Sequence, residues 1–281
     1  MHIRNPVEWG VDQLKHAGTA IERAAGAARD VPAPAIRRIA LADLYEALIR
    51  GVEDFAAFRT DVAFICVIYP VVGIVLARLV FGYEMLPLLF PLASGFALIG
   101  PVAAVGLYEM SRRREVGAEA GWADAFGVFL APSFAAIMRF GLLLMAIFLL
   151  WLNVAIWLYD VTLGPEQPVS LSAFAHDVFA TEAGWILIVA GIGIGFLFAV
   201  VVLAISVVSV PLLLDREVGI ITAILTSLRA VAANPGPMAA WGLIVAAGLV
   251  IGSIPLFFGL IVVMPVLGHA TWYLYRRVVA P

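Results

Sequence analysis

The feature that most constrains this sequence is a set of long runs without any charged side chain. The longest run, from Ala230 to Tyr275, contains 46 uncharged residues, which would extend about 69 Å as a single helix. A transmembrane helix needs only about 20 apolar residues to cross a hydrocarbon core of about 30 Å. This run is therefore long enough to cross a bilayer twice, and we expect the reversal at Ser253-Ile254-Pro255.

Four further runs are long enough to cross a membrane once. The whole chain has 63% hydrophobic and 13% charged residues, whereas soluble domains have about 45–50% and about 25%. An ordinary soluble protein is excluded. We predict an all-α, polytopic membrane protein with six transmembrane helices. The expected spans are about 62–81, 85–108, 140–159, 184–214, 238–252 and 256–275.

The beginning of the chain is far more polar than the rest. Of the 37 charged side chains (17 Lys and Arg plus 20 Asp and Glu), 17 lie in residues 1–61. We expect residues 1–60 to form a cytoplasmic amphipathic helical arm and residues 61–281 to form the membrane domain. Within 41–58 the apolar side chains recur at helical spacing, which is typical of a helix that lies on the inner membrane surface or packs on interfacial helices.

Positive charges predict the orientation, because loops rich in Lys and Arg stay on the cytoplasmic side. With both termini inside, the external segments 82–84, 160–182 and 253–255 carry neither Lys nor Arg. Only Arg78 lies toward the external face. We therefore expect an inner-membrane protein whose amino and carboxyl termini are both cytoplasmic.

The tetrapeptide Arg-Glu-Val-Gly occurs at 114–117 and again at 216–219. Each copy follows an inward-running span and precedes a predicted interfacial helix, at 118–132 and 220–233 respectively. We interpret this order as a parallel internal repeat with equivalent turns, in which the two glycines share one backbone conformation. The alternative is a topogenic anchor with a helix cap. The candidate regulatory or lipid-contact surface comprises Arg114, Glu115, Gly117, Arg216, Glu217 and Gly219.

Several stretches resemble a known family. They are residues 98–109, 205–217, 233–238 and 268–272. Together they are similar to the DUF2189 family of predicted bacterial integral membrane proteins, over about residues 40–278. The resemblance implies a six-span bacterial inner-membrane protein. It implies no activity, because the function of the family is unknown, although some members carry the label of putative cytochrome c oxidase subunit.

The number and positions of the histidines test the label of cytochrome c oxidase subunit. A haem–copper oxidase core needs several imidazoles inside the bilayer, but the chain has four histidines and only His269 lies in a predicted span. A catalytic oxidase subunit is excluded, whereas accessory association with a respiratory complex stays open. We expect no cofactor and no metal. We interpret His269 as part of an inner aromatic belt with Trp272, Tyr273 and Tyr275.

No catalytic pattern is visible elsewhere. The only lysine, Lys15, lies outside any glycine-rich turn, so no phosphate-binding loop is predicted. The net charge of −3 gives no basic field for nucleic acid. We interpret the glycines of two apolar runs as helix-packing positions. These are Gly191, Gly195, Gly248 and Gly252.

These observations favour a protein that is not an enzyme. We expect an accessory, scaffold or assembly factor whose partners are the lipid bilayer and other membrane proteins or a second copy of itself. The alternative is a small-solute transporter or channel. That alternative would require a water-accessible cavity near the bilayer midplane, reaching Ser94, Asn153 or Ser206.

Overall fold

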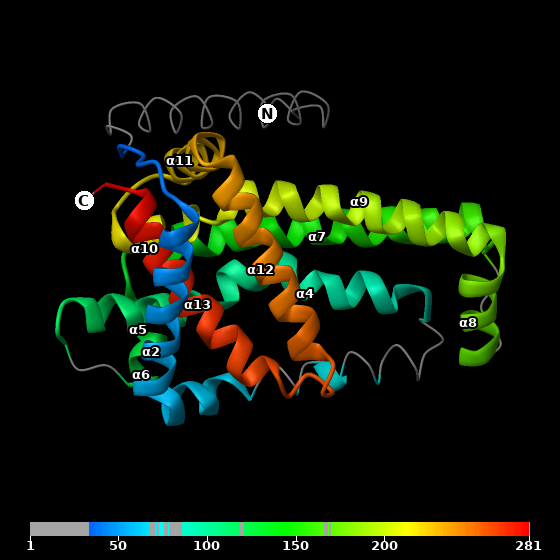
Figure 1. The fold of residues 1–281 in the computed structure, drawn as a ribbon, viewed down its shortest axis with the longest axis horizontal. Coiled ribbons are helices and arrows are strands. Elements are labelled where there is room, and N and C mark those ends of the chain that lie inside the picture. The colour runs from blue at the N-terminus through cyan, green and yellow to red at the C-terminus, as the bar shows by residue number, and fades with distance from the viewer. Residues whose placement is uncertain are drawn as a thin grey trace, which may run out of the picture.

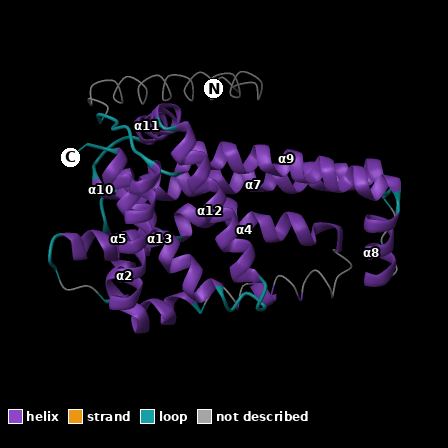
Figure 2. Cartoon of the chain, in the orientation of Figure 1, coloured by secondary structure: helices purple, strands orange, loops and turns teal. Residues whose placement is uncertain are grey.

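The structure is a computed structural model, which describes residues 34–67, 71, 73–75, 78, 86–118, 121–165, 168 and 170–280. The predicted arm before residue 34 and nine of the 20 residues of the predicted span 62–81 lie outside these residues. The described part consists of helices joined by short loops (Figure 2), with one isolated antiparallel β-bridge between Ile36 and Val279. The all-α class is confirmed.

The helices follow one another with few long connections. In chain order they are α2 (Leu41–Cys66), the 3-10 helix η1 (Leu86–Leu88), α4 (Leu89–Ala103), α5 (Val105–Glu115), α6 (Trp122–Ala125), the 3-10 helix η2 (Phe126–Leu130), α7 (Phe134–Thr162), α8 (Leu171–Ala180), α9 (Glu182–Ser206), α10 (Ser209–Asp215), α11 (Ile220–Ala233), α12 (Pro235–Ser253) and α13 (Leu260–Val278).

One layer of the molecule consists of α4, α7 and α9, which contact one another. Helices α7 and α9 run along the long axis of the molecule, and α8 caps their far end (Figure 1). Three described segments are long and apolar enough to cross a membrane: α7, the segment 182–215 that comprises α9 and α10, and α12, with mean hydropathies of 2.4, 3.0 and 1.6. These segments make the chain an integral membrane protein. The other predicted spans stay predictions.

A second layer consists of α2, α12 and α13, which run across the direction of α7 and α9 (Figure 1). Helix α2 packs along α13 in antiparallel orientation. One of the two expectations for residues 41–58 placed this helix on interfacial helices, but its main contact is with α13. The two backbones approach closely at Gly51, where a Cβ atom would lie 2.6 Å from the carbonyl oxygen of Val266. Glycine is therefore needed there. Helix α2 also runs without a break through the predicted arm boundary at residue 60.

Two predicted spans are not continuous helices. Segment 85–108 breaks at Ala104, three residues after Pro101, which lies inside α4. Segment 184–214 breaks at residues 207–208, and Pro211 then falls in the first turn of α10, where proline is tolerated. The reversal expected at 253–255 occupies residues 254–259, so α13 begins at Leu260.

The two Arg-Glu-Val-Gly turns differ from the expectation. Gly117 ends α5 with φ +72°, and the N–H groups of Gly117 and Ala118 donate to the carbonyls of Arg114 and Arg113, as in a Schellman motif. Gly219 instead precedes α11 with φ −72°. The predicted matching of the two conformations is wrong, because one glycine closes a helix and the other opens one.

The regions after these turns differ as well. The predicted helix 220–233 is confirmed as α11. The predicted single helix 118–132 is wrong, since this stretch contains the four-residue α6 followed by η2. Asp124 accepts a hydrogen bond from the N–H of Gly121 at 2.9 Å, which starts a new short helix inside the stretch.

Candidate functional site

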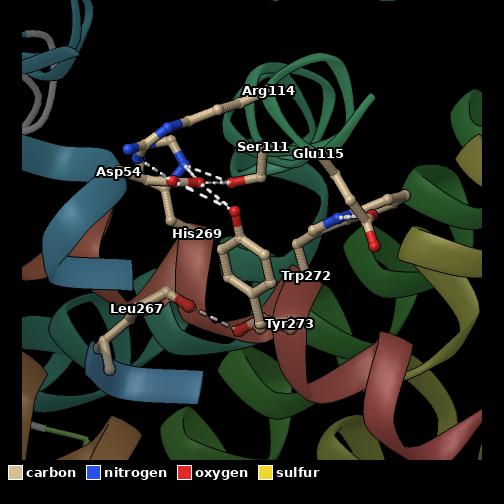
Figure 3. A network of polar contacts seen from close by, with 9 residues as sticks. Asp54, Ser111, Arg114, Glu115, Leu267, His269, Trp272 and Tyr273 are labelled. Atoms are coloured by element: carbon tan, nitrogen blue, oxygen red, sulfur yellow. Dashed lines mark hydrogen bonds and ion pairs between the residues drawn. The ribbon is translucent and has the colours of Figure 1, made fainter. Parts of the chain in front are cut away.

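A cluster of polar side chains joins α2, α5, α10 and α13 at one end of the α7–α9 pair, and we call it the polar junction. Figure 3 shows most of it from close by. Its members come from four helices that are far apart in the sequence. They are Asp54, Ser111, Arg114, Glu115, Asp215, His269, Trp272, Tyr273, Tyr275 and Arg276.

Asp54 lies at the centre of the junction and is only 1% exposed. Its carboxylate accepts hydrogen bonds from the Ser111 hydroxyl at 2.5 Å and the Tyr273 hydroxyl at 3.0 Å. Arg114 adds an ion pair. A buried carboxylate is tolerated only when its charge is balanced and its oxygens accept hydrogen bonds. Three donors from two other helices meet this requirement, so Asp54 fixes α2 to both α5 and α13.

His269 is fully buried beside Asp54. Its Nδ1 lies 2.8 Å from the Ser111 oxygen. Because the single Ser111 proton goes to Asp54, Nδ1 must carry the proton of this contact, which assigns the Nδ1–H tautomer. Among the described residues Nε2 has no hydrogen-bond partner, although the Leu107 carbonyl faces the ring. The imidazole is therefore a neutral donor inside the protein.

The presence of Asp, His and Ser together invites comparison with a catalytic triad. In a triad one imidazole nitrogen contacts the carboxylate while the other accepts the proton of the nucleophile. Here Ser111 lies between Asp54 and the same nitrogen of His269, and the second nitrogen contacts neither. Ser111 is also fully buried. This geometry stabilises a helix contact and does not activate a nucleophile.

The second half of the junction surrounds Arg276. Its guanidinium lies 3.0 Å from Glu115 and 3.5 Å from Asp215. Glu115 also accepts from the indole N–H of Trp272 at 3.1 Å, and Asp215 accepts from the hydroxyl of Tyr275 at 2.6 Å. Glu115 belongs to the first Arg-Glu-Val-Gly copy, and Asp215 directly precedes the second. Arg276 therefore connects the two turns.

Of the other residues of the predicted surface, only Arg114 belongs to the junction. Arg114 pairs with Asp54, and Arg216 donates to the Ala280 carbonyl at 2.5 Å. Gly117 and Gly219 have open space around them, and the junction includes neither of them nor Glu217. The structure thus brings Arg114 and Glu115 together with the carboxyl-terminal helix, an arrangement that the sequence pattern did not indicate.

The predicted aromatic belt is also different in the structure. Trp272 and Tyr275 are fully buried inside the protein, as is His269. Each donates to a protein carboxylate or hydroxyl rather than facing lipid. The expectation failed because a belt at the membrane interface and a buried polar cluster require the same residue types.

The four predicted packing glycines lie at helix contacts. A Cβ atom at Gly195 would approach Trp151 to 3.2 Å, and one at Gly191 would lie 3.8 Å from Leu158. A Cβ atom at Gly248 would lie 3.2 Å from Leu267, and one at Gly252 only 2.7 Å from Leu260. The first two contacts join α9 to α7, and the other two join α12 to α13.

Two pockets open beside the junction, with volumes of about 330 and about 480 Å³. Arg50, Glu115 and Tyr273 line both of them. The smaller pocket also contains Arg37 and the end of α13, and the larger pocket contains Asp54. Within the described residues, no group of three or more His, Cys, Asp or Glu side chains could hold a metal ion.

Sequence reasoning missed Asp54 and Ser111. A signal for Asp54 existed, because Leu44, Ala47 and Gly51 precede it at spacings of three and four residues and all four share the buried face of α2. No comparable signal marks Ser111, whose partners lie 57 and 158 residues away in the sequence.

Comparison with known proteins identifies a family for the middle of the chain. Residues 89–215 match the family DUF2189, described as a predicted integral membrane protein. The recognition of this family is confirmed over that segment, which extends from α4 to α10. No curated protein and no solved structure matches the chain. The junction thus joins two helices of the matched segment, α5 and α10, to α2 and α13 outside it.

Proposed function

We propose that this membrane protein is a non-catalytic accessory or scaffold protein that presents α2 to another membrane protein. The observation that carries the proposal is a second apolar face on α2. One face of this helix is buried against α13, but another stays exposed. The exposed side chains are Leu41, Tyr45, Ile49 and Val52, at 62, 67, 39 and 51% exposure, and we call them the α2 stripe.

The α2 stripe has the geometry of a helix-binding surface. Its residues follow one another at spacings of four, four and three, so they form one continuous line along about three helical turns. The opposite face of α2 is fixed by Asp54 and by the close approach at Gly51. A rigid helix loses little entropy when it binds a partner, which favours recognition of an apolar helix from another protein.

The charge of α2 favours a protein partner over a lipid surface. Helices that lie on anionic membranes are rich in Lys and Arg on their polar face. Helix α2 carries five acidic residues and two basic ones. The acidic residues are Asp43, Glu46, Glu53, Asp54 and Asp61. We therefore propose a partner that offers an apolar helix flanked by basic side chains.

Transport is less well supported by the polar groups in the apolar layer. The Ser94 hydroxyl accepts from the indole N–H of Trp151 at 3.0 Å, and the Asn153 amide donates to the Leu149 carbonyl of its own helix at 2.7 Å. Ser206 is buried. None of these three residues lines either of the two pockets beside the polar junction.

The six-span topology with cytoplasmic termini is part of the proposal. The distribution of charge supports it, because α8 lies at the opposite end of the α7–α9 pair from the carboxyl terminus (Figure 1). The segment 160–182 that includes α8 has no Lys or Arg, whereas Arg216, Arg276 and Arg277 lie at the other end.

Site-specific photo-crosslinking in native membranes tests the proposed function. A photoreactive residue at Tyr45 of the full chain should give a discrete protein adduct, and one at Ile192 on α9 should give lipid adducts. The substitution Ile49→Glu should abolish the Tyr45 adduct without changing the thermal unfolding of the purified protein. Ala57→Glu, on α2 outside the stripe, is the matched control. Lipid adducts alone at Tyr45, or solute flux through the purified protein in liposomes, would contradict the proposal.

A further inference from the structure

The smaller pocket beside the junction has an unusual concentration of positive charge, and we call it the arginine pocket. It lies between the segment before α2, α2 itself and the last turn of α13. Its lining contains four guanidinium groups and one carboxylate. These belong to Arg37, Arg50, Arg276, Arg277 and Glu115.

The four arginines differ in how their charge is balanced. Arg276 pairs with Glu115 and Asp215, and Arg277 pairs with Asp43 at 3.3 Å and with Glu46. Within the part of the chain that the structure describes, neither Arg37 nor Arg50 has a carboxylate within 4.0 Å. The Arg50 guanidinium lies 5.4 Å from the centre of the Tyr273 ring. Arg37 and Arg50, which are both exposed, thus line one cavity without a carboxylate partner among the described residues.

The backbone of Arg37 is held in place on both sides. Its N–H donates to the Val278 carbonyl at 2.8 Å, and its carbonyl accepts from the Asn234 side chain at 3.1 Å. The same Asn234 accepts from the N–H of Ile39 at 2.8 Å. The segment that carries Arg37 is therefore fixed to both α13 and the start of α12. A binding group on such a fixed segment needs little reorganisation to meet a ligand.

Arg50 is positioned by the polar junction. It extends from α2 over Tyr273, whose hydroxyl donates to the buried Asp54. Glu115 does not neutralise the pocket by itself, because it already accepts from Trp272 and pairs with Arg276. Because Arg276 and Arg277 are already paired with carboxylates, Arg37 and Arg50 remain for a ligand.

We infer that the arginine pocket binds a phosphate group. Guanidinium groups present their N–H donors as a planar fork that matches the oxygens of phosphate, and two such forks can hold one group from two directions. The volume of about 330 Å³ is at the small end of the range for ligand sites. It suits a phosphate with a small substituent, which a lipid headgroup or a soluble phosphate compound can supply.

The test measures binding to the full-length protein with two probes. Inorganic phosphate is titrated into protein in a neutral detergent. Separately, thermal unfolding is compared in nanodiscs of phosphatidylcholine with and without phosphatidylglycerol. Arg37→Gln and Arg50→Gln should each weaken binding about tenfold, because each removes one charge-assisted contact. Arg38→Gln is the matched control, since Arg38 is adjacent to Arg37 and exposed like it, but lies outside both pockets.

Each outcome of these two measurements either supports or overturns phosphate binding in the arginine pocket. Binding of inorganic phosphate identifies a soluble ligand, and stabilisation only by phosphatidylglycerol identifies a headgroup. Both support the pocket if Arg37→Gln and Arg50→Gln weaken the effect and Arg38→Gln does not. Arg37→Lys separates geometry from charge, because it keeps the charge but loses the fork and should weaken binding by less than Arg37→Gln. No effect of either probe, or equal effects of all the Gln variants, would overturn it. These results do not depend on the proposed partner of α2.

Discussion

Two antiparallel helix pairs in this protein are built in opposite ways. The α7–α9 pair closes on apolar contacts, such as Trp151 against Gly195, and exposes large apolar side chains to its surroundings, including Leu142 and Ile192. The α2–α13 pair also has a close contact at glycine, at Gly51, but it encloses a buried carboxylate.

The hydrogen bonds show the same contrast. In α7 the side chains of Asn153 and Thr162 donate to carbonyls of their own helix. In the other pair the hydrogen bonds of Asp54 cross from α2 to α5 and α13. Apolar surfaces in lipid have little hydrophobic drive to associate and little directional preference. A buried polar cluster has only one arrangement that satisfies it, so the register of α2 on α13 is specified in a way that the register of α7 on α9 is not.

The largest effect should follow from removing the centre of this cluster. Asp54→Ala leaves the Ser111 and Tyr273 hydroxyls without the carboxylate that accepts from them. Each unsatisfied buried group costs about 1–3 kcal/mol, so we expect a total loss of about 2–6 kcal/mol in the free energy of unfolding. Denaturation by titration with sodium dodecyl sulfate would measure it. Glu53→Ala changes an exposed neighbouring carboxylate and should have little effect. Equal losses for the two variants would remove the distinction between the helix pairs.

The next largest effect should follow from placing a charge on the α7–α9 pair. Ile192→Arg places a charge near the middle of α9, on its exposed side. We expect a cost of about 2.5–3.5 kcal/mol in membrane insertion. The fraction of chains that insert this segment, read from a glycosylation reporter, would measure it. Val116→Arg, in the exposed turn after α5, is the control. Normal insertion of the Ile192→Arg chain would show that α9 does not face lipid there.

A smaller effect is expected where α2 and α13 approach most closely. In Gly51→Ala the new methyl group would meet the Val266 carbonyl and the Ala270 side chain at less than 3 Å. Such overpacking costs about 1–3 kcal/mol, which the same detergent titration would measure. Gly236→Ala is the matched control, because a Cβ atom there has open space. An unchanged stability of Gly51→Ala would mean that the two helices can separate without loss.

The smallest effect should come from a polar contact inside the apolar layer. Ser94→Ala removes the hydroxyl that accepts from Trp151 at 3.0 Å, but the Pro91 carbonyl remains at 3.3 Å as a second acceptor. Hydrogen bonds between membrane helices contribute about 0.6 kcal/mol on average, and the unfolding titration should show a loss of this size. A loss as large as that of Asp54→Ala would mean that both pairs depend on polar contacts.

The apolar helices could be predicted from the sequence, whereas the polar junction could not. Charge-free runs placed α7, α9 and α12, because the hydrocarbon core imposes one length and one composition on every span. The ends of the helices were harder to predict, since the breaks at Ala104 and at residues 207–208 add no charge to the sequence. Local patterns cannot show which distant helix will meet Asp54. Its partners Ser111, His269 and Tyr273 are ordinary residues of an interfacial segment until the chain is folded.

The pairing of Asp54 with the last described helix has a consequence for the order of synthesis. His269 and Tyr273 follow Asp54 by more than 200 residues in the sequence. At a translation rate of 5–20 residues per second, the ribosome needs roughly 10–40 s to complete that interval. Throughout this time α2 exists without α13, and Asp54 can meet only Ser111 and Arg114 of α5, which follow it by 57 and 60 residues. A nascent chain that stops before α13 therefore leaves the buried face of α2 uncovered and the Asp54 carboxylate without the Tyr273 hydroxyl that it meets in the finished protein.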